Sequence, residues 1–356
     1  MATLHIFNPE HDIALASNLT NFTAPHAGRQ LRADLCFLPA LWAAEGDFVL
    51  VEDVDYAARA FRRATRGRRC LVEFVTKSQL ANLPIDAVEP WGWDAALRHQ
   101  LLRAGVDETL LPTETAIAEI RQLSHRQTSA ALLRQLQGEG LIGESLLCES
   151  EETVMHQLSL HPRLVLKAPW SSSGRGIRFI EGELNDYHRG WLRNLLASQG
   201  GVMAEPYYQK VKDFGMEFEA TDEGIRYLGL SLFHTANGAY TGNILATEQT
   251  KREMMSRYVS LDLLDTIQQK ICRTLSLGNY RGPFGIDMMI VRNEKCGMRN
   301  VECDGCFLHP CVEINLRRTM GHVALAFTPT DDDIRKVMRI EYLDHYKLRI
   351  RKLYLK

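Results

Sequence analysis

Short apolar runs alternate with amphipathic stretches over the first hundred residues. The runs 4–7, 48–51 and 70–75 have the length expected of strands. An Arg-rich stretch with helical spacing, residues 56–69, separates the last two. Strands separated by helices favour a parallel α/β sheet. Because Asn8-Pro9-Glu10 directly follows the first strand, we expect it at the carboxyl edge of this sheet, where such sheets bind ligands.

The pattern changes near residue 145. Before it, a helix at 94–104 and a segment at 113–137 read as a connector, which ends at a pair of glycines. After it, pairs of strands bracket a helix with apolar positions at Tyr187, Trp191, Leu192, Leu195 and Leu196. Leu264, Ile267, Ile271 and Leu275 mark another helix. The charged residues 331–356 predict a helical tail.

Composition and charge narrow the class of protein. The chain has 356 residues, 45% of them hydrophobic, which is enough for two or three domains with a sizeable core. The net charge of −2 argues against a duplex nucleic-acid partner. The longest nearly apolar stretch, 35–44, contains Pro39 and is far shorter than the ~18 residues of a membrane span. With no export signal at the N-terminus, we expect a cytoplasmic protein that does not enter membranes.

A lysine and a Ser/Gly-rich loop follow one of the later strands. The strand 164–166 ends in Lys167, and a second strand resumes at Ile177. Glycines in such a loop let successive N–H groups converge on an anion, and a lysine adds charge for phosphate oxygens. The loop is not a Walker loop, because it lacks Gly-Lys-Ser/Thr and leads into a strand. An ordinary hairpin with a surface lysine is the alternative. The candidate phosphate ligands are Lys167, Ser171, Ser172, Ser173, Gly174 and Gly176.

Two apolar strands carry acidic side chains. Asp287 lies within 284–291, a run that is apolar on both faces, and a lone buried carboxylate is costly unless it is paired or binds a metal. In the second strand, a period of two places Cys311, Glu313 and Asn315 on one face. Carboxylate and amide oxygens suit Mg²⁺. The alternative is a strand with a solvated polar face.

These passages, in this order, resemble the ATP-grasp superfamily over roughly residues 120–328. The resemblance implies that Lys167 and its loop cover the phosphates, and that Asp287, Glu313 and Asn315 hold Mg²⁺, with Mn²⁺ as a substitute. It also implies that Glu205 and Tyr207 belong to a hinge strand that reads adenine. Asp213, just before a strand expected from Phe214, matches the family's ribose-binding acid. The remaining implied site residues are Arg126, as a nucleotide contact, and Arg317 and Arg318, as catalytic groups that stabilise an acylphosphate.

The resemblance also implies a domain organisation. Residues 1–115 would form a Rossmann-like pre-ATP-grasp α/β domain. Residues 116–330 would form a two-lobed ATP-grasp fold of α+β type, with the small lobe at about 140–205, followed by the helical tail. The distance of 26 positions from Asp287 to Glu313 is longer than expected for adjacent strands. The N-terminal unit does not identify a subfamily.

The activity implied by the resemblance is an ADP-forming ligase. A small-molecule or peptide carboxylate would be activated by ATP as an acylphosphate, and an amine or thiol would then displace phosphate. Two alternatives stay open from the sequence: an ATP-dependent kinase on the same fold, and a non-catalytic nucleotide-binding protein. The sequence also leaves open whether the chain forms a homodimer.

Four of the eight cysteines lie close together, at Cys296, Cys303, Cys306 and Cys311. Four soft ligands within 16 residues suggest a zinc site. A structural zinc site usually has two tight pairs, however, and Cys296 is badly spaced for a pair. We therefore expect no zinc at this cluster.

Overall fold

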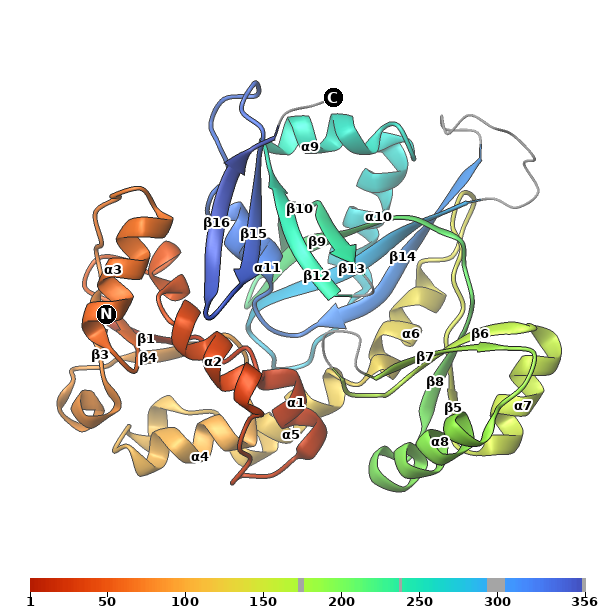
Figure 1. Ribbon diagram of the computed structural model, residues 1–356, viewed down its shortest axis with the longest axis horizontal. Helices are drawn as coiled ribbons and strands as arrows, with labels where there is room; N and C mark the ends of the chain where they lie inside the picture. Colours follow the sequence, from red (N-terminus) through yellow and green to blue (C-terminus); the bar gives the residue numbers. More distant parts are fainter. Residues whose placement is uncertain (172–175, 237–238, 293–304, 354–356) are drawn as a thin grey trace. The chain divides into compact units, whose positions relative to one another are not determined.

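The computed structural model describes residues 1–171, 176–236, 239–292 and 305–353 (Figure 1). The chain divides into two compact units, which we call unit 1 and unit 2. Unit 1 comprises residues 1–122, 241–246 and 317–356, and unit 2 comprises residues 123–240 and 247–316. Unit 1 is thus assembled from three separate segments of the chain.

Unit 1 contains a four-stranded parallel sheet with the order β3-β2-β1-β4. The prediction of a parallel α/β sheet at the N-terminus is confirmed. Because the chain runs outward from β1 to β3 and then returns to β4 beside β1, the loops after β1 and β4 diverge at a topological switch point. The strands are β1 (Thr3–Ile6), β2 (Phe48–Leu50), β3 (Glu73–Val75) and β4 (Ala87–Pro90).

Helices follow the strands of this sheet. Asp94 caps the N-terminus of helix α4 (Ala95–Arg103), since its side chain accepts a hydrogen bond from the Leu97 N–H. The helices of the N-terminal segment are α1 (His11–Ser17), α2 (His26–Leu35), α3 (Val54–Ala64), α4 (Ala95–Arg103) and α5 (Glu114–Leu123). Short 3₁₀ turns lie at Leu38–Leu41, Lys77–Asn82 and Glu108–Leu110.

The C-terminal residues form strands, so the prediction of a helical tail is wrong. β15 (Lys336–Tyr342) and β16 (Tyr346–Lys352) pair in an antiparallel hairpin, and the end of β12 (Ala239–Leu245) pairs with β15. The physical reason is a period of two: Tyr346, Leu348 and Ile350 alternate with Lys and Arg. The helix α11 (Met320–Leu325) precedes the hairpin.

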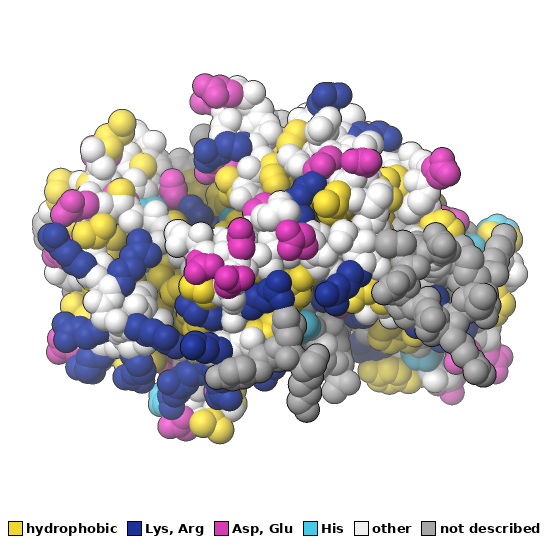
Figure 2. All heavy atoms as spheres, turned by 90° about the horizontal axis from the view of Figure 1, so that it is seen from above, with side chains coloured by type: hydrophobic (Ala, Val, Ile, Leu, Met, Phe, Trp, Pro, Cys, Tyr) yellow, Lys and Arg dark blue, Asp and Glu magenta, His cyan; other side chains and the backbone are white. Residues whose placement is uncertain are grey.

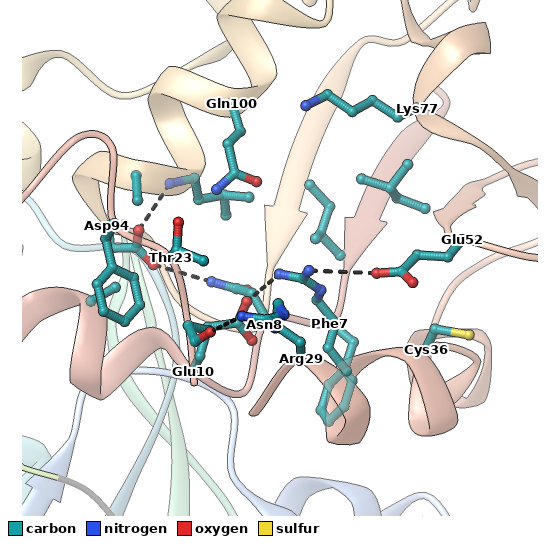
Figure 3. Close-up of a pocket in the computed structure, with 18 of the residues that line it drawn as sticks. Phe7, Asn8, Glu10, Thr23, Arg29, Cys36, Glu52, Lys77, Asp94 and Gln100 are labelled. Carbon is teal, nitrogen blue, oxygen red and sulfur yellow. Dashed lines mark hydrogen bonds and ion pairs between the residues drawn. The ribbon is translucent and has the colours of Figure 1, made fainter. Parts of the chain in front are cut away.

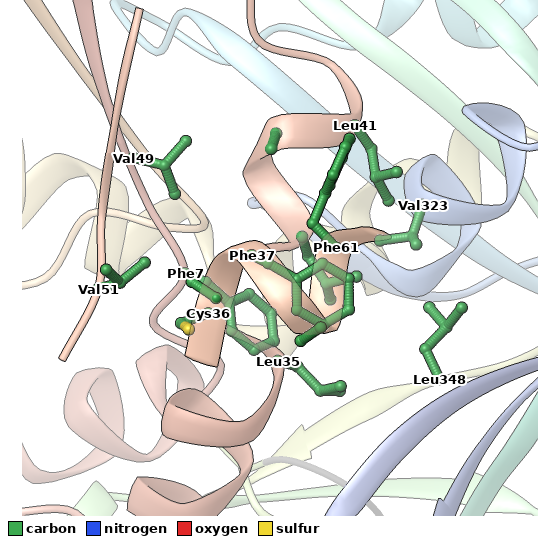
Figure 4. Close-up of a cluster of buried hydrophobic side chains, with 14 of the residues drawn as sticks. Phe7, Leu35, Cys36, Phe37, Leu41, Val49, Val51, Phe61, Val323 and Leu348 are labelled. Atoms are coloured by element: carbon green, nitrogen blue, oxygen red, sulfur yellow. The ribbon is translucent and has the colours of Figure 1, made fainter. Parts of the chain in front are cut away.

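These C-terminal elements complete the larger core of unit 1. Leu348 and Val323 pack in a cluster with Phe7, Phe37 and Phe61 (Figure 4). Each of these five side chains is at most 7% exposed. The residues after 316 are therefore part of the N-terminal unit in physical terms.

Unit 2 contains two antiparallel four-stranded sheets, which we call the small sheet and the large sheet. The small sheet has the order β5-β8-β6-β7 and the large sheet the order β10-β9-β13-β14. The small sheet consists of β5 (Leu146–Cys148), β6 (Arg163–Lys167), β7 (Ile177–Glu181) and β8 (Val202–Pro206). The large sheet consists of β9 (Lys210–Thr221), β10 (Gly224–Ser231), β13 (Gly282–Arg292) and β14 (Cys306–Asn315).

The helices of unit 2 pack against these sheets. Two of them, α7 (Glu151–Leu160) and α8 (Asp186–Gln199), bury leucines against Leu164, Leu166 and Val202 of the small sheet. The others are α6 (Arg126–Gln135), α9 (Glu248–Met255) and α10 (Leu261–Thr274), and one further strand is β11 (Phe233–Ala236). The helices predicted around 187–196 and 264–275 are confirmed.

The helices and the surface charges also bear on the expectations from the sequence. In the described part of the chain, no helix is both long and apolar enough to cross a membrane. The face shown in Figure 2 carries Lys and Arg side chains together with Asp and Glu side chains. This mixture agrees with the small net charge of the sequence.

Candidate functional site

Polar side chains line up across three strands of the large sheet. In one row, Gly215 of β9 pairs with Asp287 of β13, which pairs with Glu313 of β14. In the next row, Glu217, Gly285 and Asn315 are partners in the same order. Directly paired residues project from the same face of a sheet. Asp287, Glu313 and Asn315 are therefore brought together as predicted, and Glu217 joins them.

Glu217 is the member of this group that the sequence analysis missed. It is 4% exposed, whereas Glu219, two residues further along β9, is only partly buried. A signal was present in the strand 213–219, because the buried Phe214, Met216 and Phe218 alternate with polar or glycine positions. The two glycines opposite Asp287 and Asn315 leave the acidic side chains without a bulky neighbour in the row. A Cβ on Gly215 would lie 3.5 Å from Asp287 Oδ1.

The contacts within this group are those of an oxygen-rich cluster. Asn315 Nδ2 donates to Asp287 Oδ2 at 3.1 Å, and Glu313 Oε1 accepts from Arg126 Nη2 at 2.7 Å. The donor set of two carboxylates and an amide suits Mg²⁺, a hard cation that prefers oxygen ligands. Among the described residues, no three His, Cys, Asp or Glu side chains group closely enough to hold a metal by themselves.

A β-bulge shapes the strand that carries Glu313. The pairing of β13 with β14 passes from Asp287–Glu313 to Met289–His309, so two extra residues of β14 lie in the interval. Pro310, which has no N–H to donate, lies in this interval. Bulges redirect side chains and are common next to functional sites. The long separation of Asp287 and Glu313 in sequence thus does not prevent them from pairing.

Arg126 connects the acidic cluster to the phosphate-loop candidate. It opens α6, is 5% exposed, and its Nη1 donates to the Ala168 carbonyl and to Ser171 Oγ, at 2.5 and 2.8 Å. Its Nε is buried without a hydrogen-bond partner among the described residues. Helix α6 is held against β14 by Ser129, whose Oγ accepts from the Ile314 N–H at 2.9 Å. Arg126 is therefore a fixed cation between loop and cluster.

Lys167 is buried at the end of β6 and pairs with Glu205. Its Nζ lies 2.5 Å from Glu205 Oε2, and both side chains are less than a tenth exposed. Ser145 Oγ donates to the other carboxylate oxygen at 3.1 Å. Burying two charges is costly unless they are paired and hydrogen-bonded, and this pair meets both conditions. A second buried cation thus lies in the same unit as Arg126.

The loop that follows Lys167 is described only at its ends. Gly176 O accepts from the Ala168 N–H, and a Cβ on Gly176 would lie 2.6 Å from Ser171 Oγ. Only glycine fits this close approach. Strand β7 resumes at Ile177, as predicted. The candidates Ser172, Ser173 and Gly174 lie outside the described residues.

Two tyrosines directly after β8 differ in exposure. Tyr207 is 37% exposed, and the guanidinium carbon of Arg163 lies 3.9 Å from its ring centroid. The next residue, Tyr208, is partly buried, with its ring centroid 5.7 Å from that of His309. Burial raises the pKa of Tyr208, and the nearby Glu144 and Glu205 raise it further.

His309 is a second residue without a predicted role. It is fully buried in β14, and neither ring nitrogen has a hydrogen-bond partner among the described residues. Burial, reinforced by the nearby charge of Lys167, lowers its pKa to about 3. The imidazole is therefore neutral at physiological pH, and its nitrogens can accept or donate a hydrogen bond.

Asp213 lies within β9, which begins at Lys210 and not near Phe214 as predicted. Its Oδ2 accepts from Lys210 Nζ at 2.5 Å and from Thr235 Oγ1 at 2.6 Å. Because Asp213 precedes Gly215 by two residues, it belongs to the same face of β9 as Glu217. The carboxylate is thus positioned at one end of the acidic face.

Arg317 and Arg318 come directly after β14 and belong to unit 1. Arg317 makes two hydrogen bonds to the carboxylate of Asp12, at 2.8 and 2.7 Å. Arg318 pairs with Glu89 at 3.2 Å and lies 4.6 Å from the ring centroid of Trp42. Both guanidinium groups are therefore balanced by carboxylates in this structure.

The cysteine cluster is described only in part. Cys296 and Cys303 lie outside the described residues, so their relation to zinc stays a prediction. Cys311 lies in the bulge of β14 and is 1% exposed. Burial and the surrounding carboxylates, with Glu205 foremost, raise the pKa of its thiol. Cys311 is therefore a protonated, buried thiol beside the candidate site.

Comparisons with known proteins give a weak structural likeness. No protein-family model matches the sequence, and no curated protein matches it either. The chain is similar to N5-carboxyaminoimidazole synthetase from Staphylococcus aureus in complex with ADP, at 13% identity and a TM-score of 0.48, over 96% of this chain and 82% of that one. It is also similar to L-amino acid ligase from Bacillus licheniformis, at 13% identity and a TM-score of 0.48, over 97% and 82%.

A third structure, a putative ATP-grasp superfamily protein from Archaeoglobus fulgidus, matches at 14% identity and a TM-score of 0.47, over 99% of this chain and all of that one. Identities and scores this low do not carry an activity from one protein to another. We therefore base the function on the residues of this chain.

Proposed function

We propose that unit 2 binds ATP with Mg²⁺ and that the protein is an ADP-forming ligase of the ATP-grasp type. One observation carries the proposal: two buried cations, Lys167 and Arg126, lie in the same unit as a row of oxygen ligands on the large sheet. A polyphosphate with a divalent cation needs both kinds of group close together. The resemblance of the sequence to the ATP-grasp superfamily assigns the same residues.

The two buried cations are each balanced by a carboxylate. Lys167 pairs with Glu205, and Arg126 pairs with Glu313. When phosphate oxygens arrive, they provide an equivalent negative partner for each cation. Glu313 is then released from Arg126 and becomes available, with Asp287 and Asn315, as a metal ligand. The bound metal would supply neutralisation of phosphate charge.

The proposed contacts to adenine and ribose lie at the end of β8 and on β9. We assign adenine to the end of β8, where Glu205 and Tyr207 lie, and ribose to Asp213 at the end of the acidic face. A ribose hydroxyl would donate to the Asp213 carboxylate in place of Thr235. Ser171 and the following loop would cover the phosphates.

The chemistry is a phosphoryl transfer followed by an acyl transfer. A substrate carboxylate oxygen attacks the γ-phosphorus, ADP leaves, and an acylphosphate forms. An amine or thiol then attacks the acyl carbon, loses its proton, and expels phosphate. Arg317 and Arg318 are assigned to the acylphosphate, because a planar guanidinium matches a pair of phosphate oxygens. Each would exchange its present carboxylate partner for the substrate.

The proposal is tested by screening the full chain for ADP release with ATP, Mg²⁺ and pooled carboxylates and amines or thiols. A ligase releases ADP and phosphate only when both substrates are present. A kinase would release ADP with a single acceptor and no free phosphate. Failure to bind ATP in the presence of Mg²⁺ would contradict the proposal.

A further inference from the structure

Unit 1 contains a cavity of about 250 Å³ that the proposed nucleotide site does not use. It lies at the carboxyl edge of the parallel sheet, and the segment after each of the four strands contributes a polar side chain to its lining (Figure 3). Open α/β sheets bind ligands at this edge, next to the switch point. These side chains are Asn8 and Glu10 after β1, Glu52 after β2, Lys77 after β3, and Asp94 after β4.

Most carboxylate oxygens of this pocket already have hydrogen-bond or ion-pair partners. Asp94 accepts from Asn8 and from the Leu97 N–H, and it lies 3.3 Å from His11 Nδ1. Arg32 bridges Glu10 and Glu52. These contacts hold the floor of the pocket in a fixed arrangement.

Two cations of the pocket have no carboxylate partner. Arg29 donates to the Ala24 carbonyl, and Lys77 has no partner among the described residues. Both residues line the pocket and are exposed to solvent. In Figure 3, Lys77 and Gln100 enter from one side of the cavity, and Asn8, Glu10 and Arg29 from the opposite side. The rim therefore offers positive charge to an incoming anion.

Glu10 supplies the complementary group on the floor. It is 8% exposed, and its Oε1 pairs with Arg32. Its Oε2 is buried without a hydrogen-bond partner among the described residues. A buried carboxylate oxygen without a donor is costly, and a ligand that donates to it removes this cost. Burial raises the pKa of Glu10, against the opposing charge of Arg32.

We propose that this pocket binds a small zwitterion, of which an α-amino acid is the simplest example. Its ammonium group donates to Glu10 Oε2, and its carboxylate lies toward Lys77 on the opposite side of the cavity. Ile6, Leu50 and Leu97 of the lining offer apolar contact for the rest of the ligand. Burial raises the pKa of the Cys36 thiol in the lining to about 12, so this thiol adds no charge to the pocket. Binding depends neither on ATP nor on the proposed ligase activity.

The test is a calorimetric titration of the full-length protein, without nucleotide, with amino acids of increasing side-chain size. Each amino acid is compared with its deamino carboxylate, with its decarboxylated amine and with inorganic phosphate. We expect at least one amino acid to bind, and each half-molecule to bind at least tenfold more weakly. No binding by any amino acid, or equal binding by inorganic phosphate, would overturn the proposal.

Two variants separate the two ends of the ligand. Lys77→Gln, at an exposed site, should weaken the amino acid and its deamino carboxylate by similar factors. Glu10→Gln should weaken the amino acid but leave the deamino carboxylate unchanged, with thermal unfolding used to verify that the variant is folded. Arg68→Gln, an exposed charge change outside the pocket lining, is the matched control and should have no effect. Unchanged amino-acid affinity in Lys77→Gln would contradict the proposal.

The outcome is distinguishable from that of the ATP experiments. Asp287→Asn, which removes a proposed metal ligand in unit 2, should leave amino-acid binding by the pocket unchanged. If the chain binds amino acids but not ATP, only the proposed function is wrong. If it turns over ATP and its pocket binds no amino acid, only the present inference is wrong.

Discussion

Two side chains in unit 2 are both charged and buried. Lys167 and Arg126 are each less than a tenth exposed, and each is held by a carboxylate rather than by solvent. A buried pair of this kind costs desolvation free energy and contributes little net stability. The proposed nucleotide site gives such pairs a role, because phosphate oxygens would replace one partner of each. The predictions at this scale therefore concern individual charges and their protonation.

Glu217 is expected to matter for nucleotide turnover although it was not predicted as a ligand. Glu217→Gln keeps the shape of the side chain and removes its charge from the row that contains Asn315. We expect Mg²⁺-dependent ADP release to fall about 10–100-fold, the usual effect of changing a group beside metal ligands. The matched control is Glu219→Gln, on the same strand and face. Equal activities of the two variants would show that Glu217 has no role.

His309 is expected to make the folded state sensitive to acid. Its pKa is about 3 in the folded protein and 6.5 in an unfolded chain, so the unfolded state binds the proton more readily between these values. The free energy of unfolding should therefore decrease as the pH falls from about 6.5 toward 3. His309→Phe should flatten this dependence in urea unfolding measured at several pH values. The exposed His156→Phe should leave it intact, and the same slope in both variants would contradict the assignment.

The acidic row was predictable only where the sequence places an acid inside an apolar strand. Asp287 and Glu313 met this condition, and Asn315 lies two residues after Glu313 on the same face of β14. The pairing of β13 with β14 places the three side chains on one face of the large sheet. The same alternation marks Glu217 as one of the polar positions of its strand, but it does not distinguish Glu217 from Asp213 and Glu219. The low pKa of His309 results from burial and from the nearby charge of Lys167, and the Tyr208 ring also lies close to it. These neighbours are distant in sequence, so the environment of His309 was not predictable.

At the scale of elements, the spacing of apolar and polar positions predicted most of the strands and helices named in the sequence analysis. It placed the N-terminal strands and the helices α8 and α10 correctly. It failed for the tail because the charge of residues 331–356 was given more weight than the period of two in 346–352. The bulge in β14 was not predictable, since pairing partners are set by the neighbouring strand and not by local sequence.

Helix α6 is expected to depend on Ser129 for its attachment to β14. Ser129→Ala removes the acceptor of the buried Ile314 N–H, and an unsatisfied buried donor costs about 1–3 kcal/mol. We expect the free energy of unfolding to drop by this amount in urea denaturation. Ser198→Ala, whose hydroxyl only donates to carbonyls of its own helix, should change it by less than about 0.5 kcal/mol. A loss no larger than that of the control would rule out the proposed attachment.

For the whole molecule, each unit is built from segments that are not consecutive in the sequence. Unit 1 takes its core from the N-terminal segment, from the end of β12 and from the residues after 316. Residues after 330 look like a separate tail in the sequence, because contacts between segments distant along the chain leave no local pattern. The division of the chain thus needed the structure, whereas the fold class did not.

Leu348 is expected to stabilise unit 1 from the far end of the chain. It is 7% exposed in the core cluster shown in Figure 4, whereas Leu343, in the turn of the same hairpin, is 80% exposed. Leu348→Ala should lower the free energy of unfolding by about 2–4 kcal/mol, and Leu343→Ala should lower it by less than about 0.5 kcal/mol. Chemical denaturation followed by tryptophan fluorescence compares the two. Equal effects would mean that the hairpin is not part of the core.

The measurement that tests the account most directly is calorimetric titration of ATP into the full chain, with and without Mg²⁺. We predict that Mg²⁺ tightens binding at least tenfold in the unmodified protein. In the double variant Asp287→Asn, Glu313→Gln, the protein should stay folded and lose this Mg²⁺-dependent gain. Equal affinity for ATP with and without Mg²⁺ in the unmodified protein would contradict the proposed nucleotide site.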